Sequence, residues 1–294
     1  MNPAYSFIRI LYHFIKRSLK ESNLLINKHF FRVTKKELIN KLHDLGIKKG
    51  SLIYAHSSLS SFGYIKEGPN LIVDSLIRLI GNEGTIVMPA FTHRTGVFDA
   101  ETTKCWTGAI SETLRMRKNS VRSIHPTHSV VSLGPLARVI TKNHEKSKAP
   151  FDENSPFAKM IRRNSYILML GTENNSMIHY VQNKIRFPNL FLDGNYKIKC
   201  RINDKIKTIT TRIHHPVGSI KYVCRDRICS DVEFLTGMYK NLGFEKREYM
   251  KTVKIGKVTC HLINTIDFIK EATKYLENNI KKYKDEYQSL IKNG

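Results

Sequence analysis

Apolar residues follow two alternating patterns along the chain, and together these predict strands that alternate with helices. Short, nearly continuous apolar runs are typical of strands buried on both faces of a sheet. Such runs occupy residues 52–55, 85–88, 130–133 and 166–170. Between them, apolar residues recur at the spacing of a helix with one buried face. The predicted helices cover about residues 35–45, 69–80, 108–118, 135–143 and 156–164. The alternation indicates an α/β fold whose sheet, mostly parallel or mixed, is covered by helices on both faces.

From about residue 196 the pattern changes. Lys197–Arg201 and Ile206–Arg212 alternate polar and apolar residues around Asn203 and Asp204, which predicts a β-hairpin. We expect this hairpin to belong to a small sub-domain on the substrate side, over about residues 194–228.

The C-terminal part predicts a helix over 230–242, a strand over 252–263 and a long helix over 265–291. No Pro/Gly/Ser-rich linker, low-complexity tract or internal repeat interrupts the chain. One α/β domain over residues 34–294, preceded by an N-terminal extension over 1–33, is therefore the simplest organisation.

Composition narrows the class of protein. The chain has 49 Lys and Arg against 25 Asp and Glu, a net charge of +24, but its 41% hydrophobic content is too high for a disordered polybasic protein. No apolar stretch approaches the roughly 18 residues of a membrane-spanning helix, and no export signal is recognisable. The five cysteines form no C-x-x-C pair, which disfavours a disulfide scaffold and a cysteine-rich zinc module. A basic globular protein of the cytoplasm is expected.

The positive charge is concentrated at the N-terminus. Residues 1–49 contain eleven Lys or Arg and three acids, a net charge of +8. Apolar residues at helical spacing over 4–20 predict a basic amphipathic helix there. Such a helix either lies on an anionic membrane, which would make the protein peripheral to the inner membrane, or packs on its own domain or on a second subunit of a homo-oligomer. Because the sequence has no recognisable nucleic-acid-binding motif, no nucleic-acid partner is expected.

Polar residues gather where two predicted strands end. The turn His56-Ser57-Ser58-Leu59-Ser60 follows the first strand, and Gly171–Asn175 follows the strand at 166–170. In α/β sheets, ligands bind beyond the carboxyl ends of the strands. Hydroxyls and backbone N–H groups of the serine-rich turn could hold a phosphate or a thioester carbonyl, although polar turns of this kind are also common without a ligand.

The strongest candidate for catalysis is His179. It lies near the start of a predicted helix capped by Asn175 or Ser176, and Gln182 shares its face three residues later. A histidine at this place, with an unperturbed pKa of about 6.5, suits a general base near neutral pH. The alternative is a purely structural histidine.

Two further histidine pairs lack neighbouring carboxylates. His125 and His128 flank Pro126-Thr127, and His214 is followed by His215. Without acidic residues at the spacing of metal ligands, both pairs are interpreted as site-lining or structural, and no metal site is expected.

Blocks of sequence in order resemble the aminoglycoside 3-N-acetyltransferase family. They cover about residues 35–280 and leave the N-terminal extension outside. The blocks are Ser57-Ser58-Leu59 with Gly63, Gly84–Pro89, Thr107–Arg115, Arg122–Ser129, Ser155–Lys159, Leu168–Gly171 with Ile178-His179-Tyr180, Phe244, and Lys254–Val258. Each block alone is unremarkable, but their number and order make the resemblance strong.

The resemblance implies an α/β/α fold distinct from the GNAT acetyltransferases, and an enzyme that transfers an acyl group directly to an amine. Acetyl-CoA or another acyl-CoA would be the co-substrate, and an aminocyclitol or amino sugar the acceptor. His179 would be the base that deprotonates the amine. The CoA-binding residues would be His56, Ser57, Ser58, Leu59, Ser60, His128 and Ser129. The residues on the acceptor side would be Asn175, Arg122, His214 and His215.

The chain departs from the family pattern beside the base. The family has Glu three residues after the catalytic histidine, where this chain has Gln182. Glutamine can orient an imidazole but cannot compensate the charge of an imidazolium. Either another acid, with Glu173 the nearest in sequence, takes this role, or the enzyme is slow, or the chain is a CoA-binding or scaffold relative.

A second departure concerns the acceptor. Antibiotic-modifying members have acidic residues in the segment that aligns with about 210–219, where this chain has Arg212, His214 and His215. A basic protein repels polycationic aminoglycosides, so an anionic amino sugar from surface-polysaccharide synthesis is the favoured acceptor. A true aminoglycoside resistance enzyme remains the alternative.

Overall fold

The computed structural model describes residues 22, 25–93, 96–187, 194–214, 222–224, 227–229, 231–243 and 249–278. The predicted helix over 4–20, His215 and the last part of the helix predicted over 265–291 lie outside these residues.

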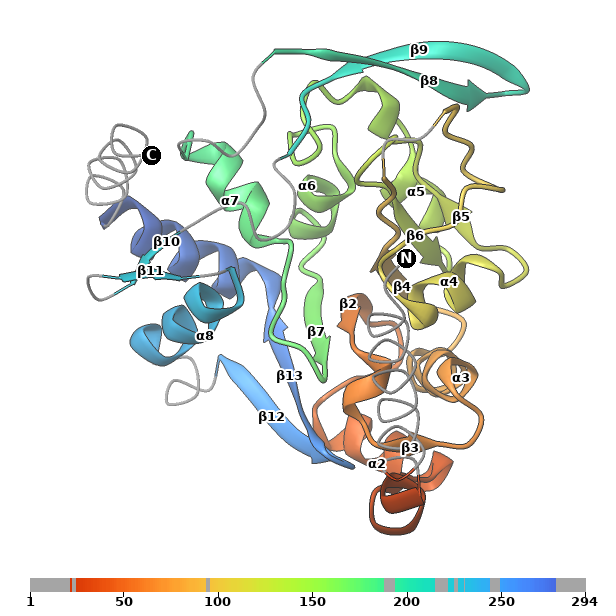
Figure 1. Cartoon of the computed structure of the whole chain (residues 1–294), viewed down its shortest axis with the longest axis vertical. Coiled ribbons are helices and arrows are strands. Elements are labelled where there is room, and N and C mark those ends of the chain that lie inside the picture. The colour runs from red at the N-terminus through yellow and green to blue at the C-terminus, as the bar shows by residue number, and fades with distance from the viewer. Residues whose placement is uncertain are drawn as a thin grey trace, which may run out of the picture.

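A seven-stranded mixed sheet forms the centre of the molecule (Figure 1). Its spatial order is β12-β13-β7-β2-β4-β6-β5. The three central strands, β7, β2 and β4, are parallel, and the strands on either side of them pair antiparallel. The strands are β2 (Leu52–Ser57), β4 (Thr85–Pro89), β5 (Val121–Arg122), β6 (Val130–Leu133), β7 (Tyr166–Leu170), β12 (Met250–Ile255) and β13 (Val258–Asn264).

Helices cover both faces of this sheet, because successive side chains of a strand point to opposite faces. In β2, Leu52 and Tyr54 belong to one buried apolar cluster, and Ile53 and Ala55 belong to another. The helices α2 (Lys35–Asp44), α3 (Pro69–Ile80) and α4 (Ala109–Arg115) contribute to the second cluster. The first cluster is formed with α5 (Ala137–Thr141), α6 (Pro156–Ile161), α7 (Ile178–Lys184), α8 (Asp231–Leu242) and the helix over 265–278. The predicted three-layer α/β/α arrangement is confirmed, with a mixed sheet.

The remaining elements are short. β1 (Arg32–Val33) pairs with β3 (Tyr64–Ile65), and β10 (Tyr222–Cys224) pairs with β11 (Arg227–Cys229). Two 3-10 helices are η1 (Leu59–Ser61) and η2 (His144–Lys146). Among the described residues, no helix is both long and apolar enough to span a membrane.

The predicted hairpin is confirmed as β8 (Tyr196–Ile202) and β9 (Lys205–Thr211). Asn203 and Asp204 form its turn with positive φ angles of 49° and 59°, a conformation that Asn and Asp tolerate better than most residues. The hairpin packs on a small apolar cluster of its own, which contains Phe98, Cys200 and Ile209. In Figure 1 it lies across one end of the molecule, outside the central sheet.

The prediction of a single strand over residues 252–263 is wrong, because this region forms a second hairpin. β12 and β13 are joined through Gly256 and Lys257 and pair antiparallel. Gly256 has φ +56°, and a Cβ there would lie 2.4 Å from the carbonyl oxygen of Phe62. The need for glycine comes from a neighbour 194 positions away in the chain, so apolar alternation alone does not reveal the turn.

Candidate functional site

The turn after β2 and the end of β7 lie side by side. Ser57 pairs with Leu170 in the parallel ladder, and the Ser58 N–H donates to the Leu170 carbonyl at 2.9 Å. The Ser58 and Ser61 hydroxyls lie 2.7 Å apart. We call residues 57–61 the serine turn. Its position at the carboxyl ends of two neighbouring parallel strands confirms the predicted placement.

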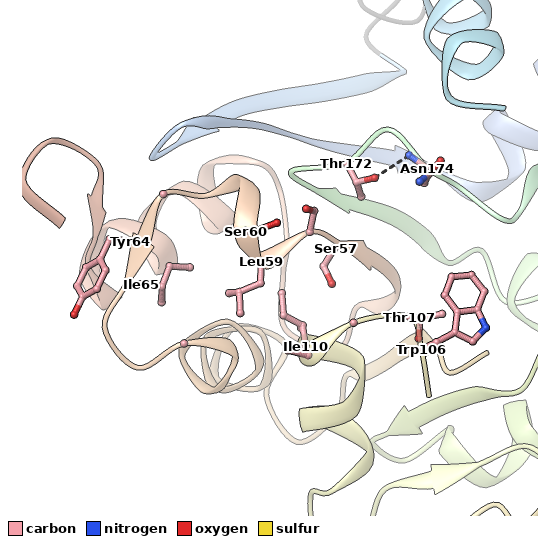
Figure 2. A pocket seen from close by; sticks show the side chains of 15 residues that line it. Ser57, Leu59, Ser60, Tyr64, Ile65, Trp106, Thr107, Ile110, Thr172 and Asn174 are labelled. Carbon is pink, nitrogen blue, oxygen red and sulfur yellow. Dashed lines mark hydrogen bonds between the residues drawn. The ribbon is translucent and has the colours of Figure 1, made fainter. Parts of the chain in front are cut away.

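Two adjoining cavities open at this edge of the sheet. The larger, of about 710 Å³, is lined by the serine turn, the residues that begin α4, and Thr172 and Asn174 after β7 (Figure 2). The smaller, of about 160 Å³, reaches inward to His56, Ser176 and His179. The lining residues common to both cavities are Ser57, Trp106, Thr107, Thr172 and Asn174. A ligand with a long arm could therefore lie in the larger cavity with its end beside His179.

His179 lies in the first turn of α7 and is held by Gln182. The Asn175 side chain accepts a hydrogen bond from the Met177 N–H at 3.0 Å, which shapes the chain just before the helix. His179 Nδ1 lies 2.7 Å from Gln182 Oε1, and Gln182 is completely buried. An amide oxygen only accepts hydrogen bonds, so this contact places the proton on Nδ1 and the lone pair on Nε2. The predicted pairing of His179 with Gln182 is confirmed.

His56 supports the segment that leads into α7. Its Nε2 accepts from the Ser176 N–H at 3.3 Å and lies 3.3 Å from the Ser176 hydroxyl, which is 2.6 Å from the Tyr54 hydroxyl. Burial, with a smaller contribution from His179, lowers the pKa of His56 to about 3. A neutral His56 therefore joins β2 to the start of α7 and fixes where His179 stands.

His179 belongs to a group of five imidazoles that we call the histidine cluster. Its members are His125, His128, His144, His179 and His214. Ring centroids are 4.2 Å apart for His179 and His214, 5.4 Å for His214 and His128, 6.1 Å for His128 and His125, and 4.6 Å for His125 and His144. Burial lowers the pKa of His144 to about 3 and holds those of His125 and His128 well below the usual value. Among the described residues, no group of His, Cys, Asp and Glu is arranged to hold a metal ion.

The structure does not bring Arg122 to the acceptor side. Its buried guanidinium donates to the Ser129 hydroxyl at 2.9 Å, to the Ala90 carbonyl at 2.6 Å and to the Thr103 carbonyl. Among the described residues that line the two cavities, neither Arg122 nor Ser129 is present. Together they tie the loop before α4 to the end of β4, and their contacts with substrate and cofactor stay predictions.

Glu173, the alternative to the missing family glutamate, has its hydrogen bond on another element than α7. Its carboxylate accepts a hydrogen bond from Thr236 on α8, whereas Gln182 is hydrogen-bonded to the His179 ring. His128 and His214 are not among the described residues that line the two cavities, but their rings contact two residues that are, Phe91 and His179. The predicted cofactor and acceptor residues that do line the cavities are His56, Ser57, Ser58, Leu59, Ser60 and Asn175.

Trp106 is the main site residue that the sequence reasoning missed. It is the only tryptophan of the chain, the residue is 44% exposed, and it lines both cavities. Its ring stacks on His93 at 5.5 Å and meets Phe91 at 6.2 Å (the indole is seen in Figure 2). Its position immediately before the block that starts at Thr107 was the available signal.

The histidines among the described residues that line the two cavities are His56 and His179. Among the described residues that line either cavity there is no carboxylate. The arrangement combines a base oriented by an amide, a groove lined by hydroxyls and an aromatic wall. It is suited to removing a proton from a nucleophile at the end of a long, narrow ligand.

Comparison with known proteins gives one family. A family model described as aminoglycoside 3-N-acetyltransferase matches residues 55–277. Among curated proteins, the aminoglycoside N(3')-acetyltransferase-like protein YokD of Bacillus subtilis is 26% identical, over 87% of this chain and 96% of its own length. Aminoglycoside N(3)-acetyltransferase III of a Salmonella species is 24% identical, over 84% of this chain and 92% of its own length.

Solved structures share the fold. Aminoglycoside acetyltransferase AAC(3)-Xa superposes with a TM-score of 0.75 at 21% identity, over 90% of this chain and 99% of that one. AAC-IIIb in a binary complex with CoASH gives a TM-score of 0.72 at 19% identity, over 85% of this chain and 98% of that one.

Proposed function

Since the chain belongs to the aminoglycoside 3-N-acetyltransferase family, we propose that it transfers the acetyl group of acetyl-CoA to an amine of an amino sugar, with His179 as the base. The observation that carries this proposal is the place of His179. Its ring is oriented by Gln182 at 2.7 Å and lines a small cavity that adjoins the larger groove of the serine turn.

The serine turn and the larger cavity would hold the CoA arm. A groove of about 710 Å³ that is lined by hydroxyls and backbone groups suits the amides of a pantetheine chain. Backbone N–H groups at the same strand ends could hold the thioester oxygen as it becomes anionic during attack. The reacting carbonyl would then stand where the two cavities meet, beside Trp106.

His179 would act on the amine. A protonated amine has no lone pair, so it must lose a proton before it attacks the thioester. With Nδ1 donating to Gln182, Nε2 of the same ring is in the form that accepts a proton. Gln182 keeps this orientation but does not compensate the imidazolium charge, so we expect a slower base than a His–Glu pair provides.

For the acceptor we propose an amino sugar that carries negative charge, such as a nucleotide-linked precursor of a surface polysaccharide. The support is electrostatic: no carboxylate lines the cavities among the described residues, Arg212 and Lys148 are exposed near His214, and the chain has a net charge of +24. As part of the same proposal, the enzyme works in the cytoplasm and the basic, amphipathic residues 4–20 contact the inner membrane.

An antibiotic acceptor is the second candidate. The observation that favours it is the family itself, whose relatives include named aminoglycoside N(3)-acetyltransferases and a structure of AAC-VIa bound to sisomicin. Under this candidate, the polar residues Thr172, Asn174 and Asn175 would replace carboxylates in holding the sugar rings.

The test is thiol release from acetyl-CoA, with an aminoglycoside and with nucleotide-linked amino sugars in parallel. Turnover on the nucleotide sugars supports the anionic acceptor, and turnover on the aminoglycoside alone supports a resistance enzyme. Acetyl-CoA binding with no turnover on any amine would contradict the proposed activity and leave a CoA-binding protein.

A further inference from the structure

His56 lines the smaller cavity, and the structure fixes the protonation of its ring. It lies near the end of β2, directly before Ser57, and is 7% exposed. Its Nε2 accepts a hydrogen bond from the Ser176 backbone N–H at 3.3 Å. A ring nitrogen that accepts a hydrogen bond carries no proton, so His56 is neutral and its one ring proton is on Nδ1.

The Nδ1–H group of His56 is a donor without a protein partner. Within the part of the chain that the structure describes, the hydrogen bonds of the His56 ring go through Nε2 alone. Nδ1 is also not one of the described side-chain atoms that are sealed from solvent without a partner. Because His56 lines the smaller cavity, this N–H opens on that cavity and can donate to an oxygen of a ligand there.

The two imidazoles that line this cavity present opposite groups to it. His179 donates through Nδ1 to Gln182, which places its lone pair on Nε2, whereas His56 presents an N–H. The two rings are near each other, since His179 contributes to lowering the pKa of His56. Acyl transfer to an amine needs both kinds of group: an acceptor for the amine proton and a donor for the oxygen that becomes anionic.

We infer that His56 is a catalytic residue of the proposed reaction, whose Nδ1–H donates to the thioester carbonyl oxygen and stabilises the negative charge that forms there. The inference rests on the proposed function and deepens it, and it adds this donor to the backbone N–H groups at the strand ends. Burial keeps the pKa of His56 at about 3, so the ring stays neutral near pH 7. A neutral imidazole holds its N–H proton tightly, so it stabilises the oxyanion without protonating it.

The proton and electron balance involves only the two substrates, solvent and His179. The acceptor ammonium loses one proton to solvent, and the lone pair of its nitrogen attacks the thioester carbon. One electron pair of the C=O bond moves to the oxygen held by His56, while His179 takes the second proton from the nitrogen. When the C=O bond forms again, the C–S bond breaks, and the proton on His179 passes to the CoA sulfur. His56 is unchanged at the end.

The test uses the two amides that each replace one nitrogen of His56. The side-chain N–H of Asn stands where Nδ1 was, and the side-chain oxygen of Gln stands where Nε2 was. H56N keeps the donor to the thioester, and its kcat should fall by about tenfold or less. H56Q keeps the acceptor for the Ser176 N–H but loses the donor, and its kcat should fall by about 10²- to 10³-fold, the effect of removing one oxyanion donor.

The carbonyl stretch of bound acetyl-CoA, labelled with carbon-13 at the carbonyl, gives a second readout. A hydrogen bond to the thioester oxygen polarises the C=O bond and lowers its stretching frequency. Infrared difference spectra should therefore show a lower frequency in the wild type and in H56N than in H56Q. If H56Q does not fold, as judged by circular dichroism and acetyl-CoA binding, H56A takes its place, since it also lacks the donor.

The matched control is Y54F, which changes the same hydrogen-bond chain away from the cavities. The Tyr54 hydroxyl lies 2.6 Å from that of Ser176, and Tyr54 is fully buried and absent from the described lining of both cavities. This variant should keep kcat within about threefold of the wild type, with the carbonyl frequency unchanged.

A higher kcat in H56Q than in H56N, or a loss in Y54F as large as that in H56Q, would overturn the inference and leave His56 as a positioning residue. The same carbonyl frequency in the wild type and in H56Q would overturn it as well. The proposed function fails in a different way: the wild type would turn over no amine, although the carbonyl frequency still differed between the wild type and H56Q.

Discussion

The serine turn and the histidine cluster meet at His179's cavity but are built in opposite ways. The serine turn consists of five consecutive residues at a strand end, partly exposed, with hydrogen bonds mostly to near neighbours. The histidine cluster joins residues from four segments between 125 and 214, and most of its members are buried. We therefore expect the turn to govern binding of the cofactor, and the cluster to govern proton transfer and the acid stability of the fold.

Replacing the proposed base His179 should have the largest effect, and it should change catalysis without changing cofactor binding. H179N should lower kcat by about 10²- to 10⁴-fold, the range of a lost general base, while the Kd for acetyl-CoA stays within about twofold of the wild type. Steady-state kinetics and calorimetric titration measure the two quantities. H43N, at an exposed position of α2, is the control and should change neither. A large loss of CoA affinity in H179N would contradict the assignment of cofactor binding to the serine turn and of proton transfer to the histidine cluster.

Acid should act on His125, His128 and His144 of the histidine cluster and on His56, which directly precedes the serine turn. The folded-state pKa is about 3 for His56 and for His144, and those of His125 and His128 are also well below the usual value of about 6.5. Below pH 6.5 the unfolded chain binds protons that the folded chain does not bind, so stability is full above that pH and falls below it. Each such histidine should lower the free energy of unfolding by about 1.4 kcal/mol per pH unit between roughly pH 6.5 and its folded-state pKa.

Urea unfolding at pH 7.5 and pH 5.5 measures this effect. H144Q should reduce the difference in unfolding free energy between the two pH values relative to the wild type, whereas the exposed substitution H43N should leave it unchanged. Equal stability of the wild-type protein at both pH values would refute the assignment of neutral, buried imidazoles.

Replacing Gln182 by the glutamate of the family pattern should show how residue 182 affects the base His179. Q182E places a carboxylate 2.7 Å from Nδ1 of His179, where it stabilises the imidazolium and raises the pKa of the base. We expect kcat to rise by roughly tenfold or less, with the acidic limb of the pH profile moved to higher pH, since a base of higher pKa is protonated at higher pH. Because residue 182 is fully buried, unfolding is measured alongside. An unchanged profile would mean that residue 182 only positions the ring.

A substitution in the serine turn should have the smallest effect. S58A removes the 2.7 Å contact with the Ser61 hydroxyl, a loss of about 0.5–1.5 kcal/mol. We expect a rise in the KM for acetyl-CoA of up to about tenfold with kcat little changed. Trp106 is the only tryptophan and lines both cavities, so its fluorescence should report acetyl-CoA binding directly. A fall in kcat without any change in KM would place Ser58 in the chemistry instead.

Much of the fold and part of the site follow from local patterns in the sequence. The strand runs, the helices between them, the β8–β9 hairpin and the pairing of His179 with Gln182 all depend on residues within a few positions of each other. Apolar periodicity and short spacings predict such features, because they reflect which face of one element is buried. The sequence blocks also identified the family, and with it the reaction.

The tertiary structure alone decided what depends on distant neighbours. The segment 252–263 forms two strands around Gly256, and the Arg122 guanidinium donates to backbone carbonyls. Glu173 accepts a hydrogen bond from Thr236, and Trp106 lines both cavities. The ring of His214 packs against that of His179. In each case the contacting residue belongs to another part of the chain. Which parts come into contact depends on how the helices and loops pack on the two faces of the sheet. A spacing along the chain cannot encode a contact of that kind, because its energy comes from burial and geometry that exist only after the layers have packed.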